Sequence, residues 1–347
     1  MFMKYLSLLF ALILMASCST QSGEKSNTNE KKGVVNVYSQ RHYNSDNKLL
    51  EKFTAQTGVK VNLVNAGADE LINRLEMEGA SSPADVFITV DAARLNRAKN
   101  KGLFQSITLK NAANLKAQFL DTDGLWFPIT YRARVIVYDI EDVDPTKIST
   151  YADLAKPEWK DQVVIRSSGS SYNQSLLASI IEASGEEAAG NWVKGIVANM
   201  ARDPKGGDRD QIKAIASGVG EVSIVNTYYL GLLLNSSNPE EVAVGQKVGV
   251  IFPNQQQGGT HVNVSGAAVT KAAPNKENAI KLLEFLTSEE SQKFYAANSF
   301  EYPAHKNVSA DSTVATFGEF IAADLGFAKD MSLTEKAVLI FDEGGWK

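Results

Sequence analysis

Short apolar runs alternate with amphipathic stretches along the chain from Val34 onward. The apolar runs at 34–39, 59–65 and 84–90 predict β-strands. Each is followed by a helical pattern, and these patterns end at Gly58, Gly79 and Gly102, as helices often do. This β-α-β-α-β-α order is typical of an α/β domain with a mostly parallel sheet and helices on both faces.

The same alternation starts again in the middle of the chain. The segment 132–139 predicts a strand, and 146–167 predicts a helix followed by a strand. The patterns that follow are a helix opening near Ser171, helices at 186–200 and 208–218, a strand at 221–225, a strand at 261–271, and helices at 276–288, 289–299, 317–324 and 333–341.

Two such α/β units, with a closing segment that we expect to rejoin the first, predict two lobes joined by crossing strands. We expect the crossings near 131–135 and 261–266. The predicted division is lobe one at 34–131 plus 266–347, and lobe two at 132–265.

The N-terminus predicts an export signal. An apolar run from Tyr5 to Ala16 follows one lysine and is too short to span a membrane comfortably. It ends at Ser17, directly before the single cysteine, Cys18, which resembles a bacterial lipobox. We therefore expect a lipoprotein signal peptide at 1–17, lipidation of Cys18, a flexible polar tether at 18–33, and an extracytoplasmic protein anchored in a membrane.

The composition argues against nucleic-acid binding and against a disulfide-bonded fold. The net charge is −5 and there is no run of lysine or arginine interleaved with aromatic residues, which argues against nucleic-acid binding. A single cysteine also leaves no disulfide framework. The apolar fraction of 44% is enough for an ordinary globular core, and we expect a monomer.

Candidate chemistry lies in the tyrosines at strand-to-helix junctions. Tyr43, Tyr172 and the adjacent pair Tyr228 and Tyr229 each follow a predicted strand and open a predicted helix. In open α/β sheets these junctions lie at the carboxyl ends of strands, where ligands bind. Asn226 and Thr227 are suitable N-cap residues before the pair. Aromatic packing remains the alternative.

Helix N-termini favour anions, and hence a phenolate over a phenol. A free tyrosine titrates near pH 10, so ionising several at neutral pH requires a strong nearby cation, such as a hard trivalent metal. Arg41, Arg132 and Arg134 are the nearest basic residues that could offset the phenolate charge. Each could instead be an ordinary surface or sheet-edge arginine.

Four segments carry a family resemblance. The segments "SQRHYN", "SYNQSL", "NTYYL" and 252–288 resemble the ferric-iron-binding components of bacterial ABC transporters, of the FbpA/FutA type. The resemblance runs from about Val34 to the C-terminus. It implies a class II periplasmic-binding-protein fold, with Fe³⁺ taken from a chelate into the cleft between lobes and delivered to an ABC permease and its ATPase.

The resemblance also implies the ligands. They are His42 and Tyr43 from lobe one, and Tyr172, Tyr228 and Tyr229 from lobe two. Some relatives use two tyrosines, a histidine, a glutamate and an external anion, and Glu76 or Glu78 would then be the glutamate. The presence of Tyr43 and Tyr172 favours the version that uses protein ligands alone.

Two alternatives remain. The same fold could bind a small organic cation or a phosphonate, and an extracytoplasmic metalloenzyme would need an open coordination position and a general base. The sequence lacks the HExxH, CxxC and GxSxG patterns and a complete phosphate loop, so we expect a binding protein and no enzyme. We expect His261 and His305 to be structural.

Overall fold

The computed structural model describes residues 33–347. The expected signal peptide, the lipidation at Cys18 and the tether up to residue 32 lie outside these residues. Within the described part, no helix is both long and apolar enough to cross a membrane.

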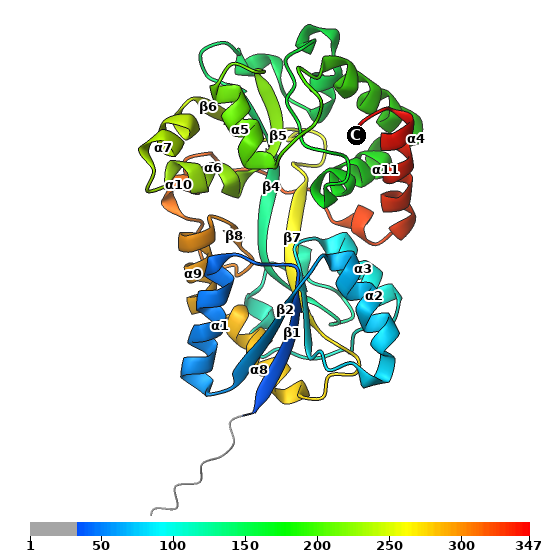
Figure 1. Ribbon diagram of the computed structural model, residues 1–347, viewed down its shortest axis with the longest axis vertical. Coiled ribbons are helices and arrows are strands. Elements are labelled where there is room, and N and C mark those ends of the chain that lie inside the picture. Colours follow the sequence, from blue (N-terminus) through cyan, green and yellow to red (C-terminus); the bar gives the residue numbers. More distant parts are fainter. Residues whose placement is uncertain (1–32) are drawn as a thin grey trace, which may run out of the picture. The chain divides into compact units, whose positions relative to one another are not determined.

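The first half has the alternation that the sequence predicts (Figure 1). Its elements are β1 (Val34–Ser39), α1 (Asn44–Thr57), β2 (Lys60–Asn65), α2 (Ala68–Glu78), β3 (Val86–Thr89) and α3 (Ala92–Asn100). Strand β1 pairs in parallel with both β2 and β3. Gly58 ends α1 in the left-handed region, with φ of 71°, where glycine has no steric penalty.

Two long strands connect the halves. Strand β4 (Phe127–Asp139) pairs antiparallel with β7 (Val262–Val269) over its first part. Its last residues pair antiparallel with β5 (Val222–Asn226) and β6 (Val248–Ile251) in the second half. The sheet order β2-β1-β3-β7-β4-β5 is therefore mixed, because the crossing strands add antiparallel pairs to the parallel ones. A short strand, β8 (Tyr302–Pro303), also pairs with β4.

Helices cover both halves. The remaining helices are α4 (Ser171–Asn199), α5 (Asp208–Ala216), α6 (Thr227–Leu234), α7 (Pro239–Gln246), α8 (Lys276–Leu286), α9 (Glu289–Ser299), α10 (Ser312–Ala315) and α11 (Met331–Glu343). Helix α4 spans two expected helices, which join at a kink where Gly185 has φ of 83°.

Two element predictions were wrong. Residues 146–167 form short 3₁₀ turns (Pro145–Lys147, Tyr151–Ala155 and Pro157–Trp159) and isolated bridges at Val163, where a helix and a strand were expected. Pro157 lies within the expected helix, and proline both lacks the N–H that an α-helix needs and restricts the residue before it, so the helical pattern is broken there. Residues 317–324 are not helical, and the short helix α10 precedes them.

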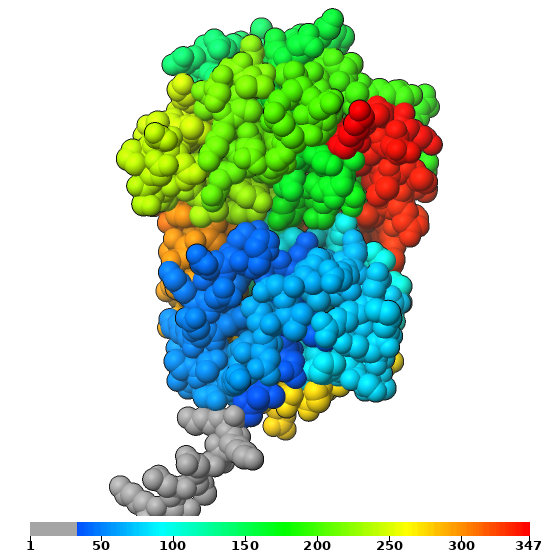
Figure 2. Space-filling view, viewed as in Figure 1, coloured from blue at the N-terminus to red at the C-terminus, as the bar shows by residue number. Residues whose placement is uncertain are grey.

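The chain end also departs from the expected lobe division. Helix α11 packs against α4 in the second half, where we expected it to return to the first (Figure 1). Trp346 donates to the carbonyl of Arg166 at 3.0 Å, and its ring centroid lies 5.7 Å from that of Trp192. Leu333, Ala337, Ile340 and Phe341 form the apolar face that α11 buries. In Figure 2 the red C-terminal segment is continuous with the green surface of the second half.

Candidate metal centre

The structure places all four predicted tyrosines at helix starts. Tyr43 is the N-cap residue of α1, and its backbone N–H donates to the Asp46 carboxylate at 3.2 Å. Tyr172 is the second residue of α4, and its N–H donates to Ser170 Oγ at 3.3 Å. Tyr228 and Tyr229 lie in the first turn of α6, directly after β5. The junctions are therefore where the sequence predicted them.

Phenols from the two halves meet. Tyr43 Oη lies 2.9 Å from Tyr228 Oη, although 185 residues separate them in the chain. The ring centroids of these two residues are 6.1 Å apart, and those of Tyr228 and Tyr229 are 4.0 Å apart. The adjacent pair and Tyr43 thus share one small region.

Burial keeps these phenols neutral when no cation is present. The pKa values of Tyr43, Tyr228 and Tyr229 are raised well above 10, first by burial and then by the negative charge that Tyr172 and neighbouring groups would carry. Arg132 acts in the opposite direction on the pKa of Tyr43 and Tyr228. A multivalent cation that ionised the phenols would remove the repulsion between them.

Asn226 holds the N-cap position of α6 without capping it through its side chain. Within residues 33–347, the Asn226 amide and Thr227 Oγ1 are buried without a hydrogen-bond partner. The expected capping bond was therefore wrong in its chemistry, although the helix starts at the expected place.

His42 lies beside Tyr43 on the exposed side of the cluster. Its ring stacks on that of Tyr43 with centroids 5.3 Å apart, and Nδ1 lies 3.1 Å from the carbonyl oxygen of Gln40. Nε2 is therefore the nitrogen that a metal would use.

The three predicted arginines are buried and near the tyrosines, so the alternative of ordinary surface arginines was wrong. The Arg41 guanidinium carbon lies 5.3 Å from the centroid of the Tyr43 ring. Arg132 Nη2 donates to Tyr172 Oη at 3.3 Å, and the Arg134 guanidinium carbon is 5.8 Å from the Tyr172 centroid.

Sequence reasoning missed the acids that hold these arginines. Glu301 lies 2.8 Å from Arg41 and 3.3 Å from Arg132, and it is 1% exposed. Asp208 is fully buried and lies 2.5 Å from Arg134 and 3.0 Å from Arg166. Single acidic residues in a loop and at a helix start carry no signal of this role in the sequence.

The other acids and histidines of interest have separate partners. Glu76 pairs with Lys101, and Glu78 accepts from Tyr38 Oη, a tyrosine outside the candidate ligand set. His261 is buried, and burial and then Arg134 lower its pKa to about 3. Across the described part of the chain, no three His, Cys, Asp or Glu residues are grouped to hold a metal. A metal centre here would depend on phenols.

Comparison with known proteins identifies the family. Residues 81–317 match the model of the family described as bacterial extracellular solute-binding protein. The chain is 48% identical over 336 residues to Iron uptake protein A1 of Synechocystis, covering 96% of this chain and 93% of that one.

Two solved structures are similar throughout, and they confirm the expected fold class. One is described as Trichodesmium (IdiA) (FutA) in complex with iron and citrate ligands, with a TM-score of 0.83 and 47% identity over 91% of this chain and 100% of that one. The other is a ferric binding protein from Campylobacter jejuni, with a TM-score of 0.86 and 44% identity over 90% and 100%. The chain therefore belongs to the bacterial extracellular solute-binding proteins.

Proposed function

We propose that this protein captures Fe³⁺ between its two halves and delivers it to an ABC permease and its ATPase. The ligands would be His42, Tyr43, Tyr172, Tyr228 and Tyr229. The observation that carries the proposal is the 2.9 Å approach of Tyr43 Oη to Tyr228 Oη, which joins helices α1 and α6 from the two halves. Relatives named for iron uptake and ferric-iron binding support it.

The chemistry follows from the neutral phenols. Fe³⁺ is a hard cation that prefers oxygen ligands. When it binds, it would displace the protons of the phenols, which would then bind it as phenolates. Four phenolates around one Fe³⁺ leave a net charge of −1, which the buried arginines at the tyrosine rings offset. Because the ligands come from both halves, a hinge movement at β4 and β7 would complete or open the shell.

The cell location is part of the same proposal. A signal peptide at 1–17 and lipidation at Cys18 would hold the protein outside the cytoplasmic membrane, where iron is captured. We expect a monomer. We also expect no enzymatic activity, because a shell of His42 and four tyrosines leaves little room for a substrate. Replacement of Cys18 by serine should move the protein from the membrane fraction to the soluble fraction.

The test is a visible spectrum of protein loaded with ferric citrate. Phenolate-to-iron charge transfer should colour it orange to red, with one iron per chain. Tyr228→Phe should shift or remove the band, because it removes one oxygen and leaves the ring. Tyr302→Phe is a matched control, since the Tyr302 hydroxyl is buried without a hydrogen-bond partner among the described residues. A loaded protein that stays colourless would overturn the proposal.

A further inference from the structure

A further contact between side chains of the two halves joins α3 to α4. Arg94, the third residue of α3, donates from Nη2 to Oε1 of Gln174 in α4 at 2.7 Å. In Figure 1, α3, α4 and α11 lie on the opposite side of β4 and β7 from α1 and α6, which bring Tyr43 and Tyr228 together. Side chains therefore join the halves on both sides of the crossing strands.

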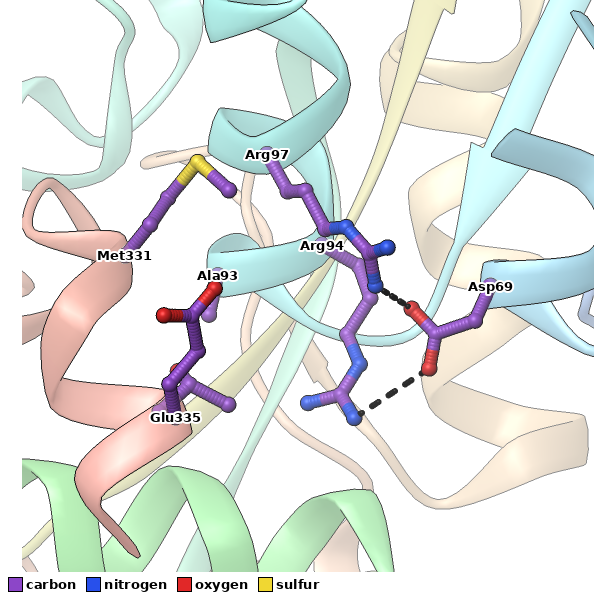
Figure 3. A pocket seen from close by; sticks show the side chains of 7 residues that line it. Asp69, Ala93, Arg94, Arg97, Met331 and Glu335 are labelled. Atoms are coloured by element: carbon purple, nitrogen blue, oxygen red, sulfur yellow. Dashed lines mark hydrogen bonds and ion pairs between the residues drawn. The ribbon is translucent and has the colours of Figure 1, made fainter. Parts of the chain in front are cut away.

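The first half holds the Arg94 side chain in place. Its Nη1 lies 3.6 Å from the carboxylate of Asp91, the N-cap residue of α3, and its Nη2 lies 3.7 Å from that of Asp69 in α2. Asp69 also accepts from Arg97 Nη1 at 2.7 Å, and Figure 3 shows it beside both guanidinium groups. Because Arg94 is only 8% exposed, its donor is oriented in advance and largely shielded from water, which strengthens a hydrogen bond.

The second half fixes the acceptor. Gln174 Nε2 donates to the carbonyl of Ser168, in the loop before α4, at 3.3 Å, and this leaves Oε1 for Arg94. Gln174 is two residues after Tyr172, and its backbone N–H donates to the carbonyl of Ser170 at 3.0 Å. The bond from Arg94 therefore attaches the first turn of α4, which carries Tyr172, to the first half.

The helices beside this bond are not closely packed. A cavity of about 130 Å³ lies between α3 and α11 (Figure 3). Arg94 and Arg97 line one side of it, and Met331 of α11 lies on the other. A close-packed apolar interface would resist separation, because its dispersion and hydrophobic contributions would be lost. Water can replace a hydrogen bond, so the bond between Arg94 and Gln174 can form and break with a hinge movement.

We propose that Arg94 is a positioning residue for iron binding: through Gln174 it holds the helix start that carries Tyr172 against the first half when the halves close. This inference rests on the proposed capture of Fe³⁺ by the tyrosines. A contact made only in the closed form favours that form, and an ion held by both halves then dissociates more slowly. Arg94 acts through Tyr172 and is not itself a ligand, so it changes the lifetime of bound iron and not the ligand set.

The experiment follows the charge-transfer band of the iron-loaded protein after mixing with excess citrate. Gln174→Leu removes the acceptor and keeps a side chain of similar size, and it should speed iron release at least about fivefold. The band position, and the rate at which colour forms on loading, should stay the same because all four phenols remain. Loss of a ligand would shift the band, which separates a positioning role from a ligand role.

A double-mutant cycle tests whether the two side chains act together. Arg94→Gln should also speed release, and the double variant should release iron no faster than the faster of the two single variants. Asn191→Leu is the control, because it removes an exposed amide further along α4 and should leave release unchanged. If Arg94→Gln fails to fold, Gln174→Leu decides the matter.

The outcomes separate this inference from the proposed function. A wild-type protein that stays colourless after loading refutes the proposed function, and this inference with it. A coloured Gln174→Leu protein that releases iron as slowly as the wild type refutes the role of Arg94 alone, as do fully additive effects in the cycle.

Discussion

Two buried ion networks flank the tyrosines, and they differ in their balance of charge. The first network pairs Arg41 and Arg132 with Asp46 and Glu301. The second network pairs Arg134 and Arg166 with one carboxylate, Asp208. Two arginines thus meet two acids in the first network, but only one acid in the second.

The surplus positive charge lies next to the half that supplies three of the four tyrosines. The guanidinium carbons of Arg134 and Arg166 are 5.8 and 5.5 Å from the Tyr172 ring centroid. Arg166 also acts to lower the pKa of Tyr229. We infer that the first network mainly holds the Tyr43 loop in place, while the second also prepares its half for negative charge.

The largest expected effect is that of Asp208→Asn, which removes the single acid of the second network. The buried Arg134 and the partly exposed Arg166 would lose their counter-charge, so the free energy of unfolding should fall by about 3–5 kcal/mol. Urea unfolding of the iron-free protein measures this change. Asp342→Asn on exposed α11 surface is the control, with an expected change within about 0.5 kcal/mol. A loss below about 1 kcal/mol for Asp208→Asn would contradict the single-acid account.

The stability should also depend on pH through His261, which is buried near Arg134 of the second network. Burial and then Arg134 lower its folded-state pKa to about 3, against about 6.5 in the unfolded chain. The unfolded state therefore binds the proton first as the pH falls. The contribution of neutral His261 to the free energy of unfolding is therefore complete above pH 6.5 and is lost towards pH 3. The loss should reach about 3 kcal/mol at pH 4.

Chemical unfolding of the iron-free protein between pH 7 and pH 4 measures this loss. His261→Gln removes the titrating ring, so its unfolding free energy should vary less over that range. An unchanged pH slope in the variant would show that other groups cause the acid sensitivity.

A smaller effect is expected from Glu301→Gln in the first network. Glutamine keeps the shape and one acceptor, and Asp46 remains 2.8 Å from Arg41. We expect a loss of about 1.5–3 kcal/mol, less than for Asp208→Asn. The two variants should be unfolded side by side in the same urea series. A larger loss for Glu301→Gln would reverse the comparison.

The smallest effect on stability is expected at His42, which is exposed beside the first network. His42→Ala should change the free energy of unfolding by less than about 0.5 kcal/mol. If Nε2 binds the metal, the iron affinity should nevertheless fall at least about tenfold, which equals 1.4 kcal/mol. Competition with citrate, followed by the visible band, measures that affinity. Unchanged affinity would remove His42 from the ligand set.

Much of the site could be predicted because it depends on local sequence. A strand followed by a polar turn and an amphipathic helix places Tyr43, Tyr172 and Tyr228 at junctions whatever the rest of the chain does. The positions of these junctions were confirmed for all three. Their convergence required one further assumption, that the junctions of both halves face each other. The 2.9 Å contact between Tyr43 and Tyr228 agrees with it.

Other features could not be predicted, since they depend on contacts between distant segments. Glu301 meets Arg41 from 260 residues away, and a lone glutamate in a loop looks like any solvated acid. Helix α11 has an apolar face that could cover either half. The spacing of its apolar residues predicts the helix but not the half against which it packs.

The sequence by itself determined the alternation of strands and helices, the helix ends at glycine, and the tyrosines at helix starts, because periodicity, capping and backbone restriction act over a few residues. Only the tertiary structure decided which acid neutralises which arginine, and which half α11 covers. The reason is that burying a charge or an apolar face is favourable only against a matching partner, and that partner is set by the whole chain.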